Sequence, residues 1–151
     1  MRDALKSLSA MTTKTFRTQS AEETIALGRK LSAELRPGIT VLLRGELGAG
    51  KTTLVKGIAE GFHAAESDRV TSPTFTLIHE YRGPKVMLYH IDLYRIDSQR
   101  ELDTLALDDL MDANSILLIE WGEKFERFRR ERDVEIAIEH RGGDERVIEI
   151  I

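Results

Sequence analysis

The sequence predicts an α/β domain in which helices alternate with strands and an antiparallel pair of strands comes last. Two observations support this class. Short apolar runs with the length of buried strands, such as ITVLL and SILLIE, are separated by longer segments with helical spacing of apolar residues. The segments DVEIAIEH and ERVIEII alternate polar and apolar residues on either side of Gly142-Gly143-Asp144, which predicts a C-terminal antiparallel hairpin. Together these patterns predict a mixed, mostly parallel sheet.

The predicted elements follow one another without an obvious linker or internal repeat. The first helix begins at a capping box formed by Ser20 and Glu23, and a second capping box at Ser98 and Glu101 opens a helix or helix pair. Helices are predicted over residues 20–35, 51–62 and 98–111, and strands over residues 39–43, 74–81, 85–92 and 115–120.

Length and composition narrow the class of protein. With 151 residues, we expect a single domain over residues 1–151, in which residues 1–12 are a candidate disordered segment. A net charge of −4 argues against binding nucleic acid through phosphate contacts alone. The absence of cysteine excludes disulfides and thiolate metal sites. We find no apolar run long enough to cross a bilayer and no secretory signal, so we expect a cytoplasmic protein without membrane contact.

The stretch GELGAGKTT directly follows the first predicted strand and matches the phosphate-loop pattern G-x-x-x-x-G-K-[ST]. Glycines bring backbone amides close to phosphate oxygens, and the start of the following helix attracts the same anion. Lys51 is expected to neutralise the β and γ phosphates of ATP, and the Thr52 hydroxyl to bind Mg²⁺. The alternative is a glycine-rich turn with an incidental lysine. The residues expected to bind the nucleotide here are Gly45, Glu46, Leu47, Gly48, Ala49, Gly50, Lys51, Thr52 and Thr53.

This motif predicts a three-layer, P-loop NTPase-like fold. Enzymes with such a loop usually have a carboxylate at the end of a strand that neighbours the one before the loop. Asp92 closes the apolar run VMLYHID and Glu120 closes ILLIE, so both are candidate metal ligands. One would bind Mg²⁺, directly or through water, and the other would orient the attacking water. The sequence leaves this assignment open. The alternative for each is a helix N-cap or a surface acid just past a strand.

Residues near these acids are further candidates. Ser72, Pro73 and Thr74 precede a predicted strand, where a switch-like threonine of phosphate-loop proteins can reach the metal or the γ-phosphate. The alternative for Thr74 is an ordinary strand start. His90 lies two residues before Asp92 on the same face of an extended strand, so it either orients that acid or is a core histidine.

Trp121 is the only tryptophan, and it either stacks near the nucleotide or packs in the core. Arg95 either contacts a phosphate or forms a surface salt bridge. The segment FERFRRER, residues 125–132, is a basic cluster that we interpret as a solvated face rather than an arginine finger.

The chain closely resembles the TsaE (YjeE) family of small bacterial ATPases, which are needed to make threonylcarbamoyladenosine on tRNA. The resemblance covers about residues 20–124, and SPTF, H-x-D-x-Y-R and E-W-x-E are its most specific parts. The resemblance also rests on the order in which these segments follow one another along the chain: GELGAGKTT, SPTFTLIHEY, YHIDLYR, ELDTLALDDL and LLIEWGEKF. The chain departs from the family at Ala106, where a glycine is expected, and in its arginine-rich segment after Glu123. It also stops right after the predicted hairpin.

The resemblance implies weak ATP hydrolysis that is controlled by the TsaD–TsaB complex, with tRNA contacted only through that complex. It implies that Lys51 and Thr52 bind the phosphates and the metal. Glu120 is then favoured over Asp92 as the metal acid, and Asp92 is implied to be a catalytic or water-positioning acid. It also implies that Trp121 lies near the nucleotide and that Thr74 belongs to a switch-like element. The transfer of the threonylcarbamoyl group belongs to TsaD.

Two other functions compete with the accessory ATPase. A small-molecule kinase of this fold needs an acceptor pocket and an arginine-rich lid, for which residues 125–132 are the candidate segment. The chain has little spare length for a substrate domain. A GTPase-like switch is disfavoured because the sequence lacks a convincing N-K-x-D motif.

Overall fold

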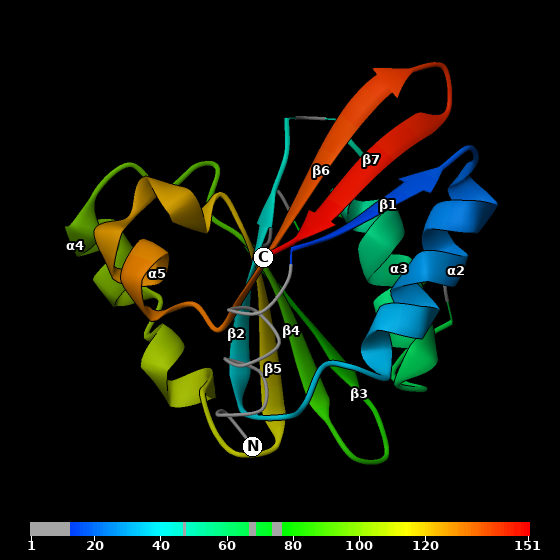
Figure 1. The fold of residues 1–151 in the computed structure, drawn as a ribbon. Helices are drawn as coiled ribbons and strands as arrows, with labels where there is room; N and C mark the ends of the chain where they lie inside the picture. Colours follow the sequence, from blue (N-terminus) through cyan, green and yellow to red (C-terminus); the bar gives the residue numbers. More distant parts are fainter. Residues whose placement is uncertain (1–12, 47, 67–68, 74–76) are drawn as a thin grey trace.

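The computed structural model describes residues 13–46, 48–66, 69–73 and 77–151. Within these residues the chain forms a seven-stranded sheet in the order β1-β7-β6-β2-β5-β4-β3 (Figure 1). The expectations for residues 1–12, Leu47 and Thr74 lie outside the described residues. The strands are β1 (Lys14–Thr18), β2 (Ile39–Arg44), β3 (Ile78–Arg82), β4 (Met87–Asp92), β5 (Ser115–Glu120), β6 (Val134–Gly142) and β7 (Glu145–Ile150).

The centre of the sheet is parallel and its edges are antiparallel. The strands β6, β2, β5 and β4 pair in parallel, so their carboxyl ends lie at one end of the sheet. Antiparallel pairings attach β7 to β6, β1 to β7 and β3 to β4. The mixed sheet and the C-terminal hairpin are therefore confirmed, but within the described residues only three of the six strand pairings are parallel, so the pairing is not mostly parallel.

Helices cover both faces of the sheet, as Figure 1 shows. Leu43 and Leu118 pack in one core with α2 and α3, whereas Leu42 and Ile119 pack in a second core with α4 and α5. Because side chains alternate along a strand, strands buried on both faces need almost continuous apolar sequence. The helices are α2 (Ala21–Ser32), α3 (Lys51–Gly61), α4 (Gln99–Thr104) and α5 (Glu126–Glu131), with the 3-10 turns η2 (Leu107–Leu110) and η3 (Gly122–Lys124).

Both predicted capping boxes start helices. The Ser20 hydroxyl accepts a hydrogen bond from the amide of Glu23 at 3.1 Å, and the Ser98 hydroxyl accepts one from the amide of Glu101 at 3.2 Å. The predicted helix pair near Ser98 is confirmed as α4 followed by η2. The first helix is shorter than predicted, because α2 ends at Ser32.

Two glycines bring α2 and α3 into close contact. A Cβ added to Gly57 of α3 would lie 2.0 Å from the carbonyl oxygen of Ile25, and one added to Gly28 of α2 would lie 2.5 Å from the carbonyl oxygen of Leu54. Backbone therefore meets backbone at this crossing, and no side chain fits between the helices. This packing determines where α3, and the glycine-rich segment before it, lie over the sheet.

The structure contains elements that the sequence did not predict. β1 has a single strongly apolar residue, Phe16, and forms by pairing with β7, far away in the sequence. The helix α5 lies inside the basic cluster of residues 125–132, and its register is set by Phe125 and Phe128, which are buried three residues apart.

Ala106 marks the departure from the family pattern. Its backbone is left-handed, with φ 49° and ψ 47°, between α4 and η2. Glycine adopts this conformation without the clash that a Cβ causes, which explains physically why a glycine was expected there.

Candidate functional site

The glycine-rich segment joins the buried strand β2 to the start of α3. Gly48 and Gly50 have left-handed backbones, with φ of 79° and 112°, which glycine adopts readily. Helix α3 begins at Lys51, directly after Gly50, with no side-chain cap and no acidic residue in its first turn. The first amides of a helix lack intrahelical partners and carry partial positive charge, so this end of α3 is suited to an anion.

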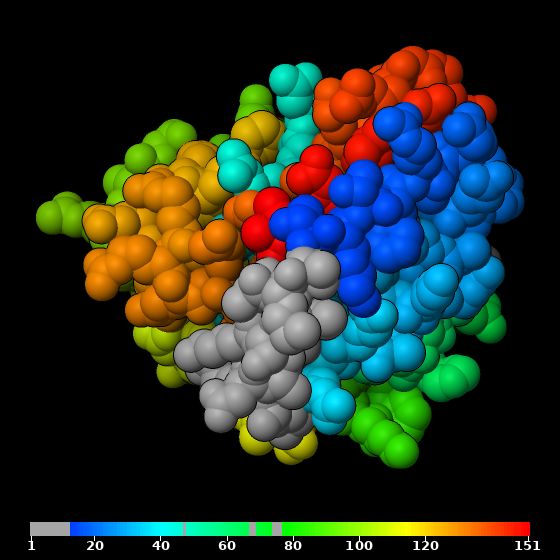
Figure 2. Space-filling view, in the orientation of Figure 1, coloured from blue at the N-terminus to red at the C-terminus, as the bar shows by residue number. Residues whose placement is uncertain are grey.

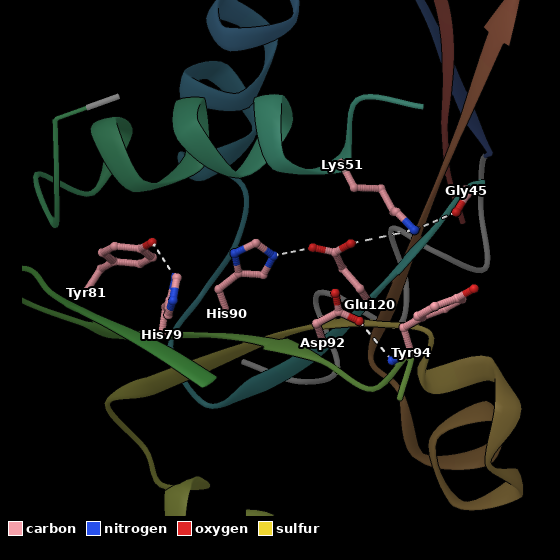
Figure 3. A network of polar contacts seen from close by, with 8 residues as sticks. All are labelled: Gly45, Lys51, His79, Tyr81, His90, Asp92, Tyr94 and Glu120. Carbon is pink, nitrogen blue, oxygen red and sulfur yellow. Dashed lines mark hydrogen bonds and ion pairs between the residues drawn. The ribbon is translucent and has the colours of Figure 1, made fainter. Parts of the chain in front are cut away.

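The ammonium group of Lys51 lies inside the protein, against three groups of its own chain. Only 5% of this residue is exposed. Its Nζ donates to the carbonyl oxygen of Gly45 at 2.5 Å and lies 3.6 Å from Oε1 of Glu120 (Figure 3). It also lies 4.5 Å from the centre of the Trp121 ring. These contacts compensate a buried positive charge and aim it at the strand ends below α3.

Glu120 ends β5, and Asp92 ends the neighbouring parallel strand β4 as its Cα partner. Both carboxylates are buried, with 4% and 3% of the residue exposed. His90 and Asp92 are two residues apart, so they lie on the face of β4 that carries the core residues packed with α3. Lys51, Glu120, Asp92 and His90 are therefore gathered at the carboxyl ends of the central strands (Figure 3).

His90 bonds a different acid from the one that the sequence suggested. Its Nε2 lies 2.5 Å from Oε2 of Glu120, on the adjacent strand. Asp92 instead accepts a hydrogen bond from the amide of Tyr94 at 2.8 Å, as short acids do when they begin a turn. The β4–β5 pairing brings the side chains of His90 and Glu120 together, a contact that was not among the alternatives predicted from the sequence.

The environment of Glu120 favours its ionised form. Burial alone would raise the pKa of this carboxyl group, but the hydrogen bond and charge of His90, together with the charge of Lys51, lower it below its ordinary value. At neutral pH Glu120 is therefore a buried carboxylate held between two nitrogen donors.

The backbone of Trp121 has a strained, left-handed conformation. Its φ is 63° and its ψ 18°, a left-handed conformation that costs free energy for a large residue. The indole ring contacts both Lys51 and the ring of Tyr94, whose centre is 5.2 Å away. Tyr94 is the tyrosine of the H-x-D-x-Y-R motif and lies in the turn after β4, but no role was predicted for it.

The other predicted residues lie around this centre. Ser72 is exposed and Pro73 is buried, shortly before β3, while Arg95 is exposed in the turn after β4. The arginines of the basic cluster are held by acids: Arg127 pairs with Asp108 and Glu131, Arg130 with Glu126, and Arg132 with Glu135. Arg129 donates to the carbonyl oxygen of Glu123. These arginines are thus engaged by acids or by a backbone carbonyl, and the prediction of a solvated face rather than an arginine finger stays a prediction.

A hollow of about 350 Å³ adjoins the glycine-rich segment. In Figure 2, cyan atoms of the segment after β2 reach the surface between the orange atoms of the α5 region and the red and orange atoms of the C-terminal hairpin. The hollow is lined by Arg44, Gly45, Glu46, Trp121, Glu123, Ala137, Ile138, Glu139, Val147 and Glu149.

The donor groups suit Mg²⁺ shared with a phosphate better than a metal held by protein alone. Within the described residues, no three His, Asp or Glu side chains gather into a metal site. Mg²⁺ is typically bound by one or two carboxylates together with water and substrate phosphates. Two buried carboxylates and the Thr52 hydroxyl at the start of α3 meet that requirement.

None of the helices in the part of the chain that the structure describes is long and apolar enough to cross a membrane.

Comparison with known proteins identifies the family. The family model described as "Threonylcarbamoyl adenosine biosynthesis protein TsaE" matches residues 18–148. The chain belongs to the TsaE family. This family is involved in the biosynthesis of threonylcarbamoyladenosine on tRNA.

Curated TsaE proteins and a solved structure are similar over most of the chain. The tRNA threonylcarbamoyladenosine biosynthesis protein TsaE of Bacillus subtilis is 40% identical over 88% of this chain and 82% of its own length. That of Haemophilus influenzae is 40% identical over 80% of this chain and 75% of its own length. The crystal structure of Bacillus subtilis YdiB has a TM-score of 0.71 at 35% identity, and the match covers 92% of this chain and 84% of YdiB.

Proposed function

We propose that this TsaE-family protein is a P-loop ATPase that binds and slowly hydrolyses Mg-ATP. It acts in the cytoplasm as an accessory subunit of the tRNA threonylcarbamoyladenosine system, on the TsaD–TsaB complex. The observation that carries the proposal is the contact between Lys51 at the start of α3 and Glu120 at the end of β5. A phosphate-loop lysine and a strand-end carboxylate are the two charges that phosphoryl transfer from a nucleotide requires.

The proposed phosphate site is the glycine-rich segment and the first turn of α3. The amides at the start of α3 donate to phosphate oxygens, and Gly48 and Gly50 allow the backbone to approach them. Lys51 exchanges its bond to the Gly45 carbonyl for the β and γ phosphates. The ring of Trp121, which contacts Lys51, lies close enough to sense this exchange.

Thr52, Glu120 and Asp92 are the proposed metal-binding residues. When bound, Mg²⁺ supplies positive charge that offsets the charge developing on the transferred phosphoryl group. Glu120 is the main carboxylate for the metal in this proposal, because its Oε1 lies 3.6 Å from Nζ of Lys51 at the start of α3. Asp92 orients the attacking water, which displaces ADP from the γ-phosphorus and releases inorganic phosphate.

Partner control fits the way the charges are held. Lys51 is paired with Glu120 and the Gly45 carbonyl, so ATP would compete with these internal partners. We infer that TsaD–TsaB shifts this balance, and that tRNA is contacted only through the complex, since the chain has a net charge of −4. In the candidate kinase lid, Arg127 is paired with Asp108 of η2 and Arg130 with Glu126 of α5, which favours the ATPase over the kinase alternative.

The test is ATP hydrolysis with Mg²⁺, measured for the chain alone and after mixing with a TsaD–TsaB pair from the same organism. We expect a slow basal rate that changes on mixing. Nucleotide binding without hydrolysis in either sample would contradict the proposal and favour transfer to a small-molecule acceptor.

A further inference from the structure

His90 is the most deeply buried polar side chain of the site and has a single hydrogen-bonded contact. It is 0% exposed, and its Nε2 lies 2.5 Å from Oε2 of Glu120. The other ring nitrogen, Nδ1, is buried and makes no hydrogen bond in the structure as described. Burying a ring nitrogen without a partner costs free energy that an apolar residue at this position would avoid. The bond to Glu120 is therefore the interaction that this side chain provides.

The direction of that bond follows from the groups that face Glu120. Its carboxylate lies against the ammonium group of Lys51, which only donates, so it acts as an acceptor and Nε2 of His90 donates to Oε2. The second oxygen, Oε1, is left facing Lys51 at 3.6 Å (Figure 3). The hydrogen bond from His90 therefore keeps Oε2 of Glu120 on the side away from Lys51.

This division of the two oxygens determines what the site can bind. A glutamate side chain rotates about several bonds, and beside a buried ammonium group its carboxylate would otherwise close on Lys51 with both oxygens. Lys51 would then be less able to bind phosphate, and Glu120 less able to bind a metal. Hydrogen bonds to ligating carboxylates commonly have this orienting role.

We propose that His90 is a positioning residue that holds the Glu120 carboxylate in the orientation in which Oε1 is available to the metal. The inference rests on the proposed function, because the metal arrives with ATP. His90 is 0% exposed and acts only through its bond to Glu120 in this proposal.

The test compares His90→Leu, His90→Gln and His90→Asn, with His79→Leu as the matched control. A glutamine side chain places an N–H near the position of Nε2, whereas asparagine reaches only as far as Nδ1. His79 faces His90 across the β3–β4 pair but bonds Tyr81 instead of Glu120. For each variant we would measure the Mg²⁺ concentration at half-maximal hydrolysis, ATP affinity in EDTA, and the midpoint of thermal unfolding.

We expect His90→Leu and His90→Asn to raise the half-saturating Mg²⁺ concentration about tenfold or more, with ATP affinity in EDTA nearly unchanged. His90→Gln should recover most of the loss, and His79→Leu should behave like the wild type. The inference is overturned if His90→Leu leaves the Mg²⁺ dependence unchanged. It is equally overturned if folded His90→Gln is as impaired as His90→Leu.

A second readout does not depend on ATP. In ¹⁵N NMR spectra of the nucleotide-free chain, Nε2 of His90 should carry hydrogen, and its signal should move when Glu120 is replaced by glutamine. A signal that stays in place would show that the two side chains are not coupled, and would overturn the inference even if the wild type hydrolyses ATP. Conversely, a wild type that binds no nucleotide but shows this coupling would refute the ATPase proposal and keep the contact.

Discussion

Lys51 and Glu120 are opposite charges that are both almost completely removed from water. Removing one partner of such a pair leaves the other buried and uncompensated, which commonly costs several kcal/mol. His90 and the Gly45 carbonyl complete the hydrogen bonding of the two groups. Substitutions here therefore have to be judged by binding and turnover together with stability.

The two strand-end acids give the sharpest prediction for single residues. Glu120→Gln and Asp92→Asn keep the size of each side chain but remove the charge, so we expect a folded protein whose Mg²⁺-dependent ATP hydrolysis falls by about a hundredfold. Steady-state phosphate release measures this. Asp97→Asn is the control, because its side chain is 85% exposed and lies on the loop after β4. Unchanged rates in both acid variants would contradict the metal assignment.

The lowered pKa of Glu120 predicts how stability depends on pH. The unfolded chain binds a proton on this group near its ordinary pKa of 4.5, whereas the folded chain does so only at lower pH. The stabilisation is therefore fully present above about pH 4.5 and is lost as the pH falls through the folded-state pKa. Urea unfolding of the wild type and of Glu120→Gln at pH 7 and in this acidic range measures the difference. Equal acid sensitivity of the two proteins would show that Glu120 is not the group responsible.

Sequence patterns could predict Lys51, Asp92 and Glu120 because each is defined by its neighbours along the chain. Lys51 follows a local motif, and the two acids directly end apolar strands. The pairing of His90 with Glu120 could not be predicted, because it depends on the register of two strands that are distant in sequence. The left-handed backbone of Trp121 is equally a product of tertiary packing.

At the level of elements, the contact between α2 and α3 holds α3 in place. We predict that Gly57→Ala destabilises the protein by about 1–3 kcal/mol, because the new methyl group would meet the backbone of Ile25. Helix propensity alone predicts the opposite sign, a gain of about 1 kcal/mol. Urea unfolding decides between them, with Lys56→Ala on the same helix as control. A stabilised Gly57→Ala variant would show that the helices separate without cost.

Elements with local signals were predictable, and those made by distant pairing were not. The capping boxes at Ser20 and Ser98 and the apolar run of β5 lie where the sequence placed them. β1 has little apolar content and exists because β7 offers an edge to pair with. Helix α5 was not predicted, because charged residues surround its two apolar anchors, Phe125 and Phe128.

At the level of the whole molecule, the fold brings four distant segments to one end of the sheet. The glycine-rich segment, the ends of β4 and β5, and the C-terminal hairpin meet there because the central strands are parallel and β2 lies between β6 and β5. Similarity to YdiB over 92% of the chain supports this arrangement as a property of the family. The place of the protein in tRNA modification follows from that family, whereas its ATPase activity and its partners are proposals.

The central claim is that the Lys51 site binds Mg-ATP. The most direct measurement is a titration of Mg-ATP into the wild type, Lys51→Ala and Lys56→Ala. Binding is detected by calorimetry and by the fluorescence of Trp121, the only tryptophan in the sequence. We predict that the wild type and Lys56→Ala bind with the same affinity and change their fluorescence, because Lys51 moves relative to the indole ring. We predict that Lys51→Ala weakens binding by about tenfold or more. Near-normal binding by Lys51→Ala would contradict the account.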